Sequence, residues 1–276
     1  QVLCKLGGVS RAAYYKWLNR EIPESELENR RIAELVERIH NESPDKGYRR
    51  IRDELERYHG MDVNDKRILR ICRRLGIKST IKYANEGCTR QAANPQYIAE
   101  NILNRRFTAK APDQKWLTDV TEFHYYVGTE KHKVYLSAIL DLYDRRIVTY
   151  RIGDSNNNSL VFGTLDDAVR KNPNAHPLFH SDRGFQYTNR TFHGKLEAAG
   201  MIQSMSRVAK CIDNGPMEGF WGILKRERYY GKRFTDRESL VTMIDEYICY
   251  YNNQRLQRNL GVLTPMEKHE TYLQAA

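Results

Sequence analysis

Long apolar runs, paired cysteines and internal repeats are all missing from this sequence. With a mean hydropathy of −0.72 and 29% charged residues, no stretch approaches the roughly 18 apolar residues that a membrane helix needs. The five cysteines are scattered and form no Cys-x-x-Cys pair, which argues against a zinc ribbon or a disulfide framework and favours a reducing compartment. No export signal opens the chain. We therefore expect a soluble, cytoplasmic protein without a membrane partner.

Positive charge is present in excess. Lys and Arg number 45 against 35 Asp and Glu, which gives a net charge of +10 and a pI near 9.3. The surplus lies toward the start, because residues 1–110 hold 23 basic and 15 acidic side chains whereas residues 111–276 hold 22 and 20. A concentrated surplus suits a polyanionic partner, since each neutralised phosphate releases condensed counterions. Charge alone fits a role in solubility equally well.

The opening segment has the outline of a helix-turn-helix whose first helix is mostly missing. An apolar start is followed by Gly7-Gly8 and by a Ser10 cap before a helix from Arg11 to about Arg20. A plain amphipathic hairpin fits this short stretch equally well. Because the chain begins at Gln1 and not at an initiator methionine, we expect further sequence upstream.

Three more helices are predicted before residue 80 by their apolar spacing. They run from about Glu24 to Asn41, from Tyr48 to a break at Gly60, and from an Asn64 cap to Gly76. The last carries five cations in nine residues, as a helix that reads a nucleic-acid groove requires, although such a face is often only solvated. The candidate DNA contacts are Lys66, Arg67, Arg70, Arg73 and Arg74 on this helix, with Arg11 and Tyr15 on the first one.

The second part of the chain changes from helical to alternating spacing at Gln114, and its content of β-branched residues rises. Residues 81–111 before it lose periodicity and are predicted to form a linker with a short helical patch near Tyr97–Leu103. A three-strand meander followed by alternating helices and strands predicts an α/β fold, with a mixed sheet covered by helices on both faces. The predicted strands are Trp116–Val127, Lys133–Asp141, Ile147–Gly153, Pro177–His180 and Met201–Met205, and the predicted helices are Ser159–Lys171, Asn189–Gly200, Pro216–Tyr230 and Asp236–Asn252.

Three carboxylates lie where such a sheet presents its side chains. Asp119 is in the middle of the first strand, Asp182 ends the fourth at the edge where open α/β sheets bind ligands, and Glu218 is in the first turn of a helix. Each alone has an ordinary explanation, as a paired strand residue, a turn residue and a residue favoured by the helix dipole. Together they offer three hard oxygen ligands at one sheet edge. This set suits Mg²⁺, and the absence of His/Cys ligand spacing argues against Zn²⁺.

The segments around these carboxylates carry a family resemblance. They are Trp116–Phe123, His180–Gly184 with Gln186–Thr188, and Asp213-Asn214 with Met217-Glu218, and the tail adds Tyr251–Arg255 and Leu263–Pro265. These segments resemble the signature blocks of the DDE transposase and integrase class. Within that class the chain is similar to the second-reading-frame product of bacterial insertion-sequence transposases of the IS-three family. The likeness covers nearly the whole chain.

The resemblance implies a ribonuclease-H-like core that cuts insertion-sequence ends and joins them to other DNA. Asp119, Asp182 and Glu218 would hold two Mg²⁺ ions, for which Mn²⁺ can substitute. The implied partners are DNA, as terminal inverted repeats and as target, further copies of the chain on that DNA, and an upstream-frame protein or a frameshift fusion. The implied place is the bacterial cytoplasm, at the nucleoid. The implied boundaries are a helix-turn-helix DNA-binding region at 1–80, a linker at 81–111, the catalytic core at 112–232 and a helical extension at 233–276.

Two residues near the third carboxylate are further candidate DNA contacts. Lys225 follows Glu218 by seven positions, nearly two turns of a helix, so the two side chains share one face. An ordinary surface lysine is the alternative. Asn214 and its neighbour Asp213 either order the loop before Glu218 or touch DNA, and the first role is favoured.

Two other functions fit parts of the sequence. A DNA-binding regulator that has lost catalysis would show at least one broken carboxylate position, and all three are intact. A nuclease of the same fold that cuts without joining would use the same site and stays open.

Overall fold

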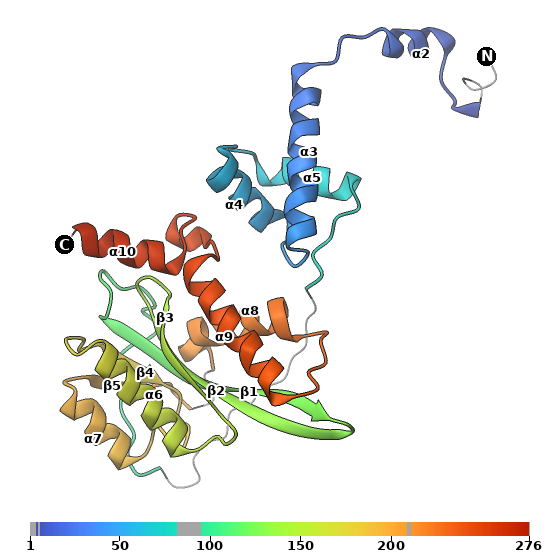
Figure 1. Ribbon diagram of the computed structural model, residues 1–276. Helices are drawn as coiled ribbons and strands as arrows, with labels where there is room; N and C mark the ends of the chain where they lie inside the picture. The colour runs from blue at the N-terminus through green and yellow to red at the C-terminus, as the bar shows by residue number, and fades with distance from the viewer. Residues whose placement is uncertain (1–3, 5, 82–94, 209–210, 276) are drawn as a thin grey trace. The chain divides into compact units, whose positions relative to one another are not determined.

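In the computed structural model, the chain divides into an all-helical unit, residues 1–80, and a unit built on a β-sheet, residues 81–276 (Figure 1). The structure describes residues 4, 6–81, 95–208 and 211–275. Residues 82–94 of the predicted linker lie outside the described residues, as do residues 1–3 and 5 of the apolar start. In the described part of the chain, no helix is long and apolar enough to cross a bilayer.

Three helices form the core of the first unit: α3 (Glu24–Glu42), α4 (Tyr48–His59) and α5 (Asp65–Arg74). Helix α4 ends because Gly60 adopts a left-handed conformation, with φ 64°. Helix α5 begins where the Asn64 side chain accepts a hydrogen bond from the Lys66 backbone N–H at 2.8 Å. The apolar stripes meet in one core that contains Ile32, Val36, Ile39, Ile51, Leu55, Val63, Ile68, Ile71 and Cys72. All three predicted helices are confirmed.

Helix α2 (Arg11–Leu18) begins as predicted, because the Ser10 hydroxyl accepts a hydrogen bond from the Ala13 backbone N–H at 3.1 Å. It ends two residues before the predicted Arg20. Every residue of α2 is exposed, with Trp17 at 60%. Part of the segment before α2 lies outside the described residues, so the helix-turn-helix outline stays a prediction, and the packed helices among the described residues of the unit are α3, α4 and α5.

The second unit contains a five-stranded mixed sheet with the order β3-β2-β1-β4-β5. The first three strands form an antiparallel meander, and β4 and β5 continue the sheet in parallel on the other side of β1. Strand β1 is therefore central and lies beside β4, as the sequence predicts. The strands are β1 (Lys115–Val127), β2 (Glu130–Asp141), β3 (Ile147–Gly153), β4 (Leu178–Ser181) and β5 (Ile202–Met205).

Helices cover both faces of this sheet (Figure 1). The pleat of β1 sends Trp116 to one face and its neighbour Leu117 to the other, and both are fully buried. Trp116 packs in a core with residues of α6 and α7, whereas Leu117 packs in a core with residues of α8 and α9. These helices are α6 (Asn158–Lys171), α7 (Arg190–Ala198), α8 (Gly215–Leu224) and α9 (Arg237–Asn253). The predicted α/β fold class is confirmed.

Residues 97–103, predicted as a helical patch, form no helix. The Leu103 backbone N–H donates to the Ser204 hydroxyl at 3.1 Å, and the Glu100 carbonyl accepts from the Met205 backbone N–H at 3.2 Å. The spacing of Ala99 and Leu103 looks helical, but Ala99 lies in the core on the α6 side and Leu103 in the core on the α8 side. Pairing with the β5 edge thus satisfies backbone groups that a helix would have used internally.

The predicted helix Pro216–Tyr230 is also not uniform. It is α-helical only through α8 and continues as one π-helical turn, η2 (Lys225–Tyr229). The Tyr230 backbone N–H donates to the Lys225 carbonyl at 2.7 Å, the longer reach that defines this turn. The turn changes the direction of the side chains that follow Leu224.

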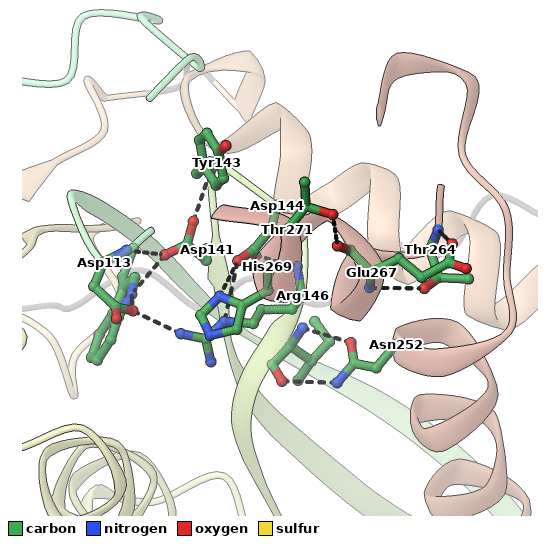
Figure 2. Close-up of polar contacts among 12 residues, drawn as sticks. Asp113, Asp141, Tyr143, Asp144, Arg146, Asn252, Thr264, Glu267, His269 and Thr271 are labelled. Carbon is green, nitrogen blue, oxygen red and sulfur yellow. Dashed lines mark hydrogen bonds and ion pairs between the residues drawn. The ribbon is translucent and has the colours of Figure 1, made fainter. Parts of the chain in front are cut away.

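The chain ends in helix α10 (Pro265–Ala275), held to the sheet by polar contacts (Figure 2). Thr264 caps it reciprocally: its N–H donates to Glu267 Oε2 at 2.9 Å, and its hydroxyl accepts from the Glu267 N–H at 3.1 Å. Asp144, fully buried after β2, has its Oδ2 2.8 Å from His269 Nδ1 and 3.3 Å from Arg146 Nε. The Leu-Thr-Pro tail signature is therefore a helix start, and His269 joins that helix to the sheet.

Candidate active site

Two of the three predicted carboxylates lie at the same level on adjacent strands. In the parallel pairing of β1 with β4, Leu117 is opposite His180. Continuing this register by two residues brings Asp119 level with Asp182, just past the end of β4. Both side chains are only partly buried, so this edge of the sheet is open to solvent.

The third carboxylate is carried over β1 by α8. The Asn214 side-chain N–H donates to the Thr118 carbonyl at 3.1 Å, and the Trp221 indole N–H donates to Asp119 Oδ2 at 3.0 Å. Glu218 lies four residues after the first anchor and three before the second, a spacing that shares one helix face. The exposed Glu218 is therefore on the face of α8 that meets the strand of Asp119.

The charges of the three carboxylates act on one another. Burial, and then the negative charges of Asp182 and Glu218, raise the pKa of Asp119 to about 8. Burial raises the pKa of Asp182, although a hydrogen bond from the Gly184 N–H opposes the shift. Burial and the charge of Asp182 also raise the pKa of Glu218. In the ranges that the structure describes, no three His, Cys, Asp or Glu side chains surround one common metal position.

The loop after β4 contacts the Asp182 carboxylate closely. The Gly184 backbone N–H donates to Asp182 Oδ1 at 2.8 Å. A Cβ atom at position 184 would lie 3.0 Å from that oxygen and 3.3 Å from Tyr187 Cδ2. A side chain here would require the Asp182 carboxylate or the Tyr187 ring to move by a few tenths of an ångström.

Two neighbours of the carboxylates are not predicted from the sequence. Trp221 is the hydrogen-bond donor to Asp119, and its position three residues after Glu218 is the signal that could have identified it. The buried Tyr187 hydroxyl lies 3.4 Å from Thr118 Oγ1. Burial and the charges of Asp119 and Asp182 raise the pKa of Tyr187 well above its usual value, which places this phenol beside both carboxylates.

Asp213 orders the loop before α8. Its carboxylate accepts hydrogen bonds from Arg105 at 2.7 Å, from Arg207 at 2.8 Å and from Asn101 at 2.9 Å. The hydrogen bonds from the Arg207 guanidinium, with those from Arg105, hold the pKa of Asp213 well below its usual range. With Asn214 bonded to β1, the Asp213-Asn214 pair has the loop-ordering contacts that the sequence favours.

Lys225 is buried, with 8% exposure, and its ammonium lies 5.2 Å from the centroid of the Phe123 ring. It is thus not an ordinary surface lysine. Its backbone N–H bonds to the Trp221 carbonyl, as in an α-helix, and the π-helical turn lies after it, so a shared helix face with Glu218 stays a prediction.

The basic helix α5 presents four of its five predicted cations to solvent, Lys66, Arg70, Arg73 and Arg74. The fifth, Arg67, donates to Asn29 Oδ1 at 2.9 Å and to Glu28 Oε2 at 2.7 Å. Arg67 therefore fixes α5 to α3. On α2, Arg11 and Tyr15 are exposed.

Replacing Asp119 by Asn is expected to stabilise the metal-free protein at pH 8. The pKa of Asp119 is raised in the folded state from the usual 3.8 to about 8, so folding takes up a proton between these values and stability falls as pH rises through this window. Asn removes that loss. With allowance for solvent screening we expect about 1–2 kcal/mol, or roughly 3–6 °C in the melting temperature. Thermal melts with a chelator at pH 8 and pH 4 check this, and an equal gain at both values would contradict it.

Three family models match this chain. Residues 109–211 and 218–273 match families described as "Integrase core domain", and residues 26–85 match an "HTH-like domain". The first two ranges contain the sheet, the three carboxylates and the tail. The third contains α3, α4 and α5, but not α2.

Insertion-sequence transposases are similar to this chain over most of its length. The chain is 36% identical to the transposase InsK of element IS150 from Escherichia coli, over 88% of this chain and 84% of InsK. It is 29% identical to InsF of insertion sequence IS3A from the same organism, over 96% of this chain and 92% of InsF. A simian T-cell lymphotropic virus intasome matches with a TM-score of 0.50 at 16% identity, over 86% of this chain and 74% of that one, a likeness of fold. The chain thus belongs to the insertion-sequence transposases of the IS-three family, with an HTH-like domain followed in the sequence by an integrase core domain.

Proposed function

We propose that this transposase cuts and joins DNA strands at the ends of its insertion sequence with the aid of two Mg²⁺ ions, for which Mn²⁺ can substitute. The observation that carries the proposal is the placement of Asp119 and Asp182 at one level of adjacent strands, with Glu218 on the face of α8 that meets the strand of Asp119. The charges of Asp182 and Glu218 raise the pKa of Asp119, which fits this closeness. Carboxylates that repel one another when all are ionised are stabilised in their charged form by a bound divalent cation.

The residues present fit such ions. The donors are all carboxylate oxygens, which Mg²⁺ prefers, and Mg²⁺ commonly takes one or two carboxylates while waters and phosphate oxygens fill its other positions. The absence of a three-ligand cluster in the described residues is compatible with this mode. When bound, the ions would supply Lewis acidity toward the phosphodiester oxygens.

The chain's own residues prepare the site. Trp221 and the Val120 backbone N–H donate to Asp119, and the Gly184 N–H donates to Asp182, so hydrogen bonds orient both carboxylates. In the proposed reaction, water first attacks a phosphodiester at the element's end and releases a 3′-hydroxyl. That hydroxyl then attacks a second phosphodiester, forming one ester bond as another breaks. Neither step needs a covalent bond to the protein.

The DNA partners follow from the two units. We propose that residues 1–80 bind the terminal inverted repeats, with α5 and its exposed cations at the phosphates, and that residues 112–232 act on them. Residues 81–111 would join the two and residues 233–276 would support the core. Target DNA, further copies of the chain, and an upstream-frame product or fusion complete the proposed assembly at the nucleoid. Lys225 and Asn214 remain proposed DNA contacts.

The direct test incubates the purified chain with DNA carrying the element's terminal repeats and Mg²⁺ or Mn²⁺. Joined products are the expected result. Cut products without joining would indicate a nuclease of the same fold, and binding without either would indicate a regulator.

Neutralising the exposed arginines of α5 is expected to weaken DNA binding. Replacing Arg70, Arg73 and Arg74 by Gln should lower the affinity at least about tenfold and reduce the slope of log K against log salt by about 2 to 3, because each phosphate contact contributes about 0.9. Titrations at several salt concentrations measure this. The control replaces the exposed Arg31 and Arg38 of α3 by Gln. If the salt slope changes equally per charge in the control, α5 has no special role in binding DNA.

A further inference from the structure

The tail signature Tyr251–Arg255 contacts both the sheet and the helix that carries Glu218. The Asn252 side chain accepts from the Ile147 N–H at 2.9 Å and donates to the Ile147 carbonyl at 3.0 Å (Figure 2). The Tyr251 ring meets the Phe220 ring edge-on, with centroids 4.7 Å apart. The signature therefore holds α9 to β3 and to α8.

Arg255 forms the most completely paired ionic contact of this region. Its Nη2 lies 2.8 Å from Glu227 Oε1 and its Nε lies 3.1 Å from Glu227 Oε2. The Tyr247 hydroxyl donates to the same Oε2 at 2.9 Å. The side chains of Arg255 and Glu227 are 12% and 3% exposed. A two-point contact of this kind fixes orientation as well as distance.

Glu227 is part of the π-helical turn η2, which continues directly from α8. Such turns are rare and often occur at functional sites. On the side of β1 the turn is held where the Tyr229 hydroxyl accepts from the His124 N–H at 2.9 Å, and where the Lys225 ammonium lies over the Phe123 ring. On the side of α9 it is held by Arg255. Since η2 and α8 form one continuous helical segment, fixing η2 also fixes the position and rotation of the helix that presents Glu218.

We propose that Arg255 is a positioning residue of the active site: through Glu227 it fixes the π-helical turn and so sets Glu218 against Asp119 and Asp182. The inference rests on the proposed function. It differs from a purely structural role, because a buried ion pair can be replaced by apolar side chains without loss of stability, whereas an apolar pair would not fix the rotation of the helix.

The experiment compares the full chain with the double variant Glu227→Met/Arg255→Met. We expect the variant to melt within a few degrees of wild type but to bind Mn²⁺ about tenfold or more weakly, the range seen when groups that orient metal ligands are removed. Electron paramagnetic resonance of free Mn²⁺ measures the affinity without DNA, and the strand-joining assay is run in parallel. The matched control is Arg151→Met/Asp167→Met, a pair with Nε–Oδ2 at 2.5 Å between β3 and α6, which should bind Mn²⁺ as wild type does.

The outcomes separate the two proposals. A folded double variant with wild-type Mn²⁺ affinity and joining would overturn the positioning role alone. A wild-type chain that neither binds Mn²⁺ nor cuts terminal DNA would overturn the proposed function, and the inference with it. If the double variant melts far below wild type, the Mn²⁺ affinity of the single variant Arg255→Lys tests the inference instead. Lysine keeps the charge but not the two-point geometry, so an unchanged Mn²⁺ affinity in that variant would also overturn the inference.

Discussion

Replacing Asp119 or Asp182 by Asn, or Glu218 by Gln, is expected to abolish strand cutting and joining while DNA binding persists. Each substitution keeps the side-chain shape but removes the negative charge that would hold a divalent cation. Loss of about 4 kcal/mol of charge stabilisation in the transition state corresponds to about a thousandfold in rate. Single-turnover assays on terminal-repeat DNA, with a gel-shift measurement beside them, test both halves of the expectation.

Melting temperatures show whether an inactive variant has lost catalysis or has lost its fold. Asp119→Asn is expected to melt above wild type at pH 8, so its inactivity would have no explanation in unfolding. The control is Glu122→Gln, on the same strand, whose carboxylate contacts Lys133 and His124. It should stay within about threefold of wild-type activity, because Glu122 is three residues from Asp119 along the strand and therefore faces the other side of the sheet. Joining at the wild-type rate by any of the three carboxylate variants would exclude that residue from the metal site.

The strands could be predicted because period-two spacing is a strong local signal. Trp116 and Leu117 are both apolar, yet they face different cores, so β1 is recognisable as a strand buried on both sides. The same reasoning placed Asp119 mid-strand and Asp182 at the carboxyl end of its neighbour. The parallel register of Leu117 with His180 bears out that arrangement.

What could not be predicted depends on contacts between distant segments. The helical spacing of Ala99 and Leu103 is real, but the unpaired edge of β5 offered the backbone better partners. The π-helical turn η2 is contacted by Arg255, 28 residues beyond Glu227, and no local spacing in the sequence signals such a contact.

Replacing Asp144 by Ala is expected to cost about 3–5 kcal/mol of stability and to loosen helix α10. Asp144 is fully buried between Arg146 and His269 (Figure 2). Removal of one member of a buried ionic group leaves the others desolvated without their partner. Arg146 keeps its contact with Asp113 at 2.8 Å, but His269 loses the contact that holds α10 to the sheet. Urea unfolding measures the cost, and faster hydrogen exchange in residues 265–275 would locate it.

The control is Asp166→Ala, which removes an ion pair with Lys195 at 2.7 Å whose carboxylate side is 53% exposed. That change should cost less than about 1 kcal/mol of stability. An equal cost for Asp144→Ala would mean that the buried network does not stabilise the fold.

Asp144→Asn separates the contribution of charge from that of hydrogen bonding. An amide can still accept from the Arg146 N–H, which lies 2.9 Å from Oδ1. The His269 ring can change tautomer to accept from the new amide group. Asp144→Asn should therefore cost less than Asp144→Ala, and an equal loss in both would mean that charge, and not hydrogen bonding, holds α10 in place.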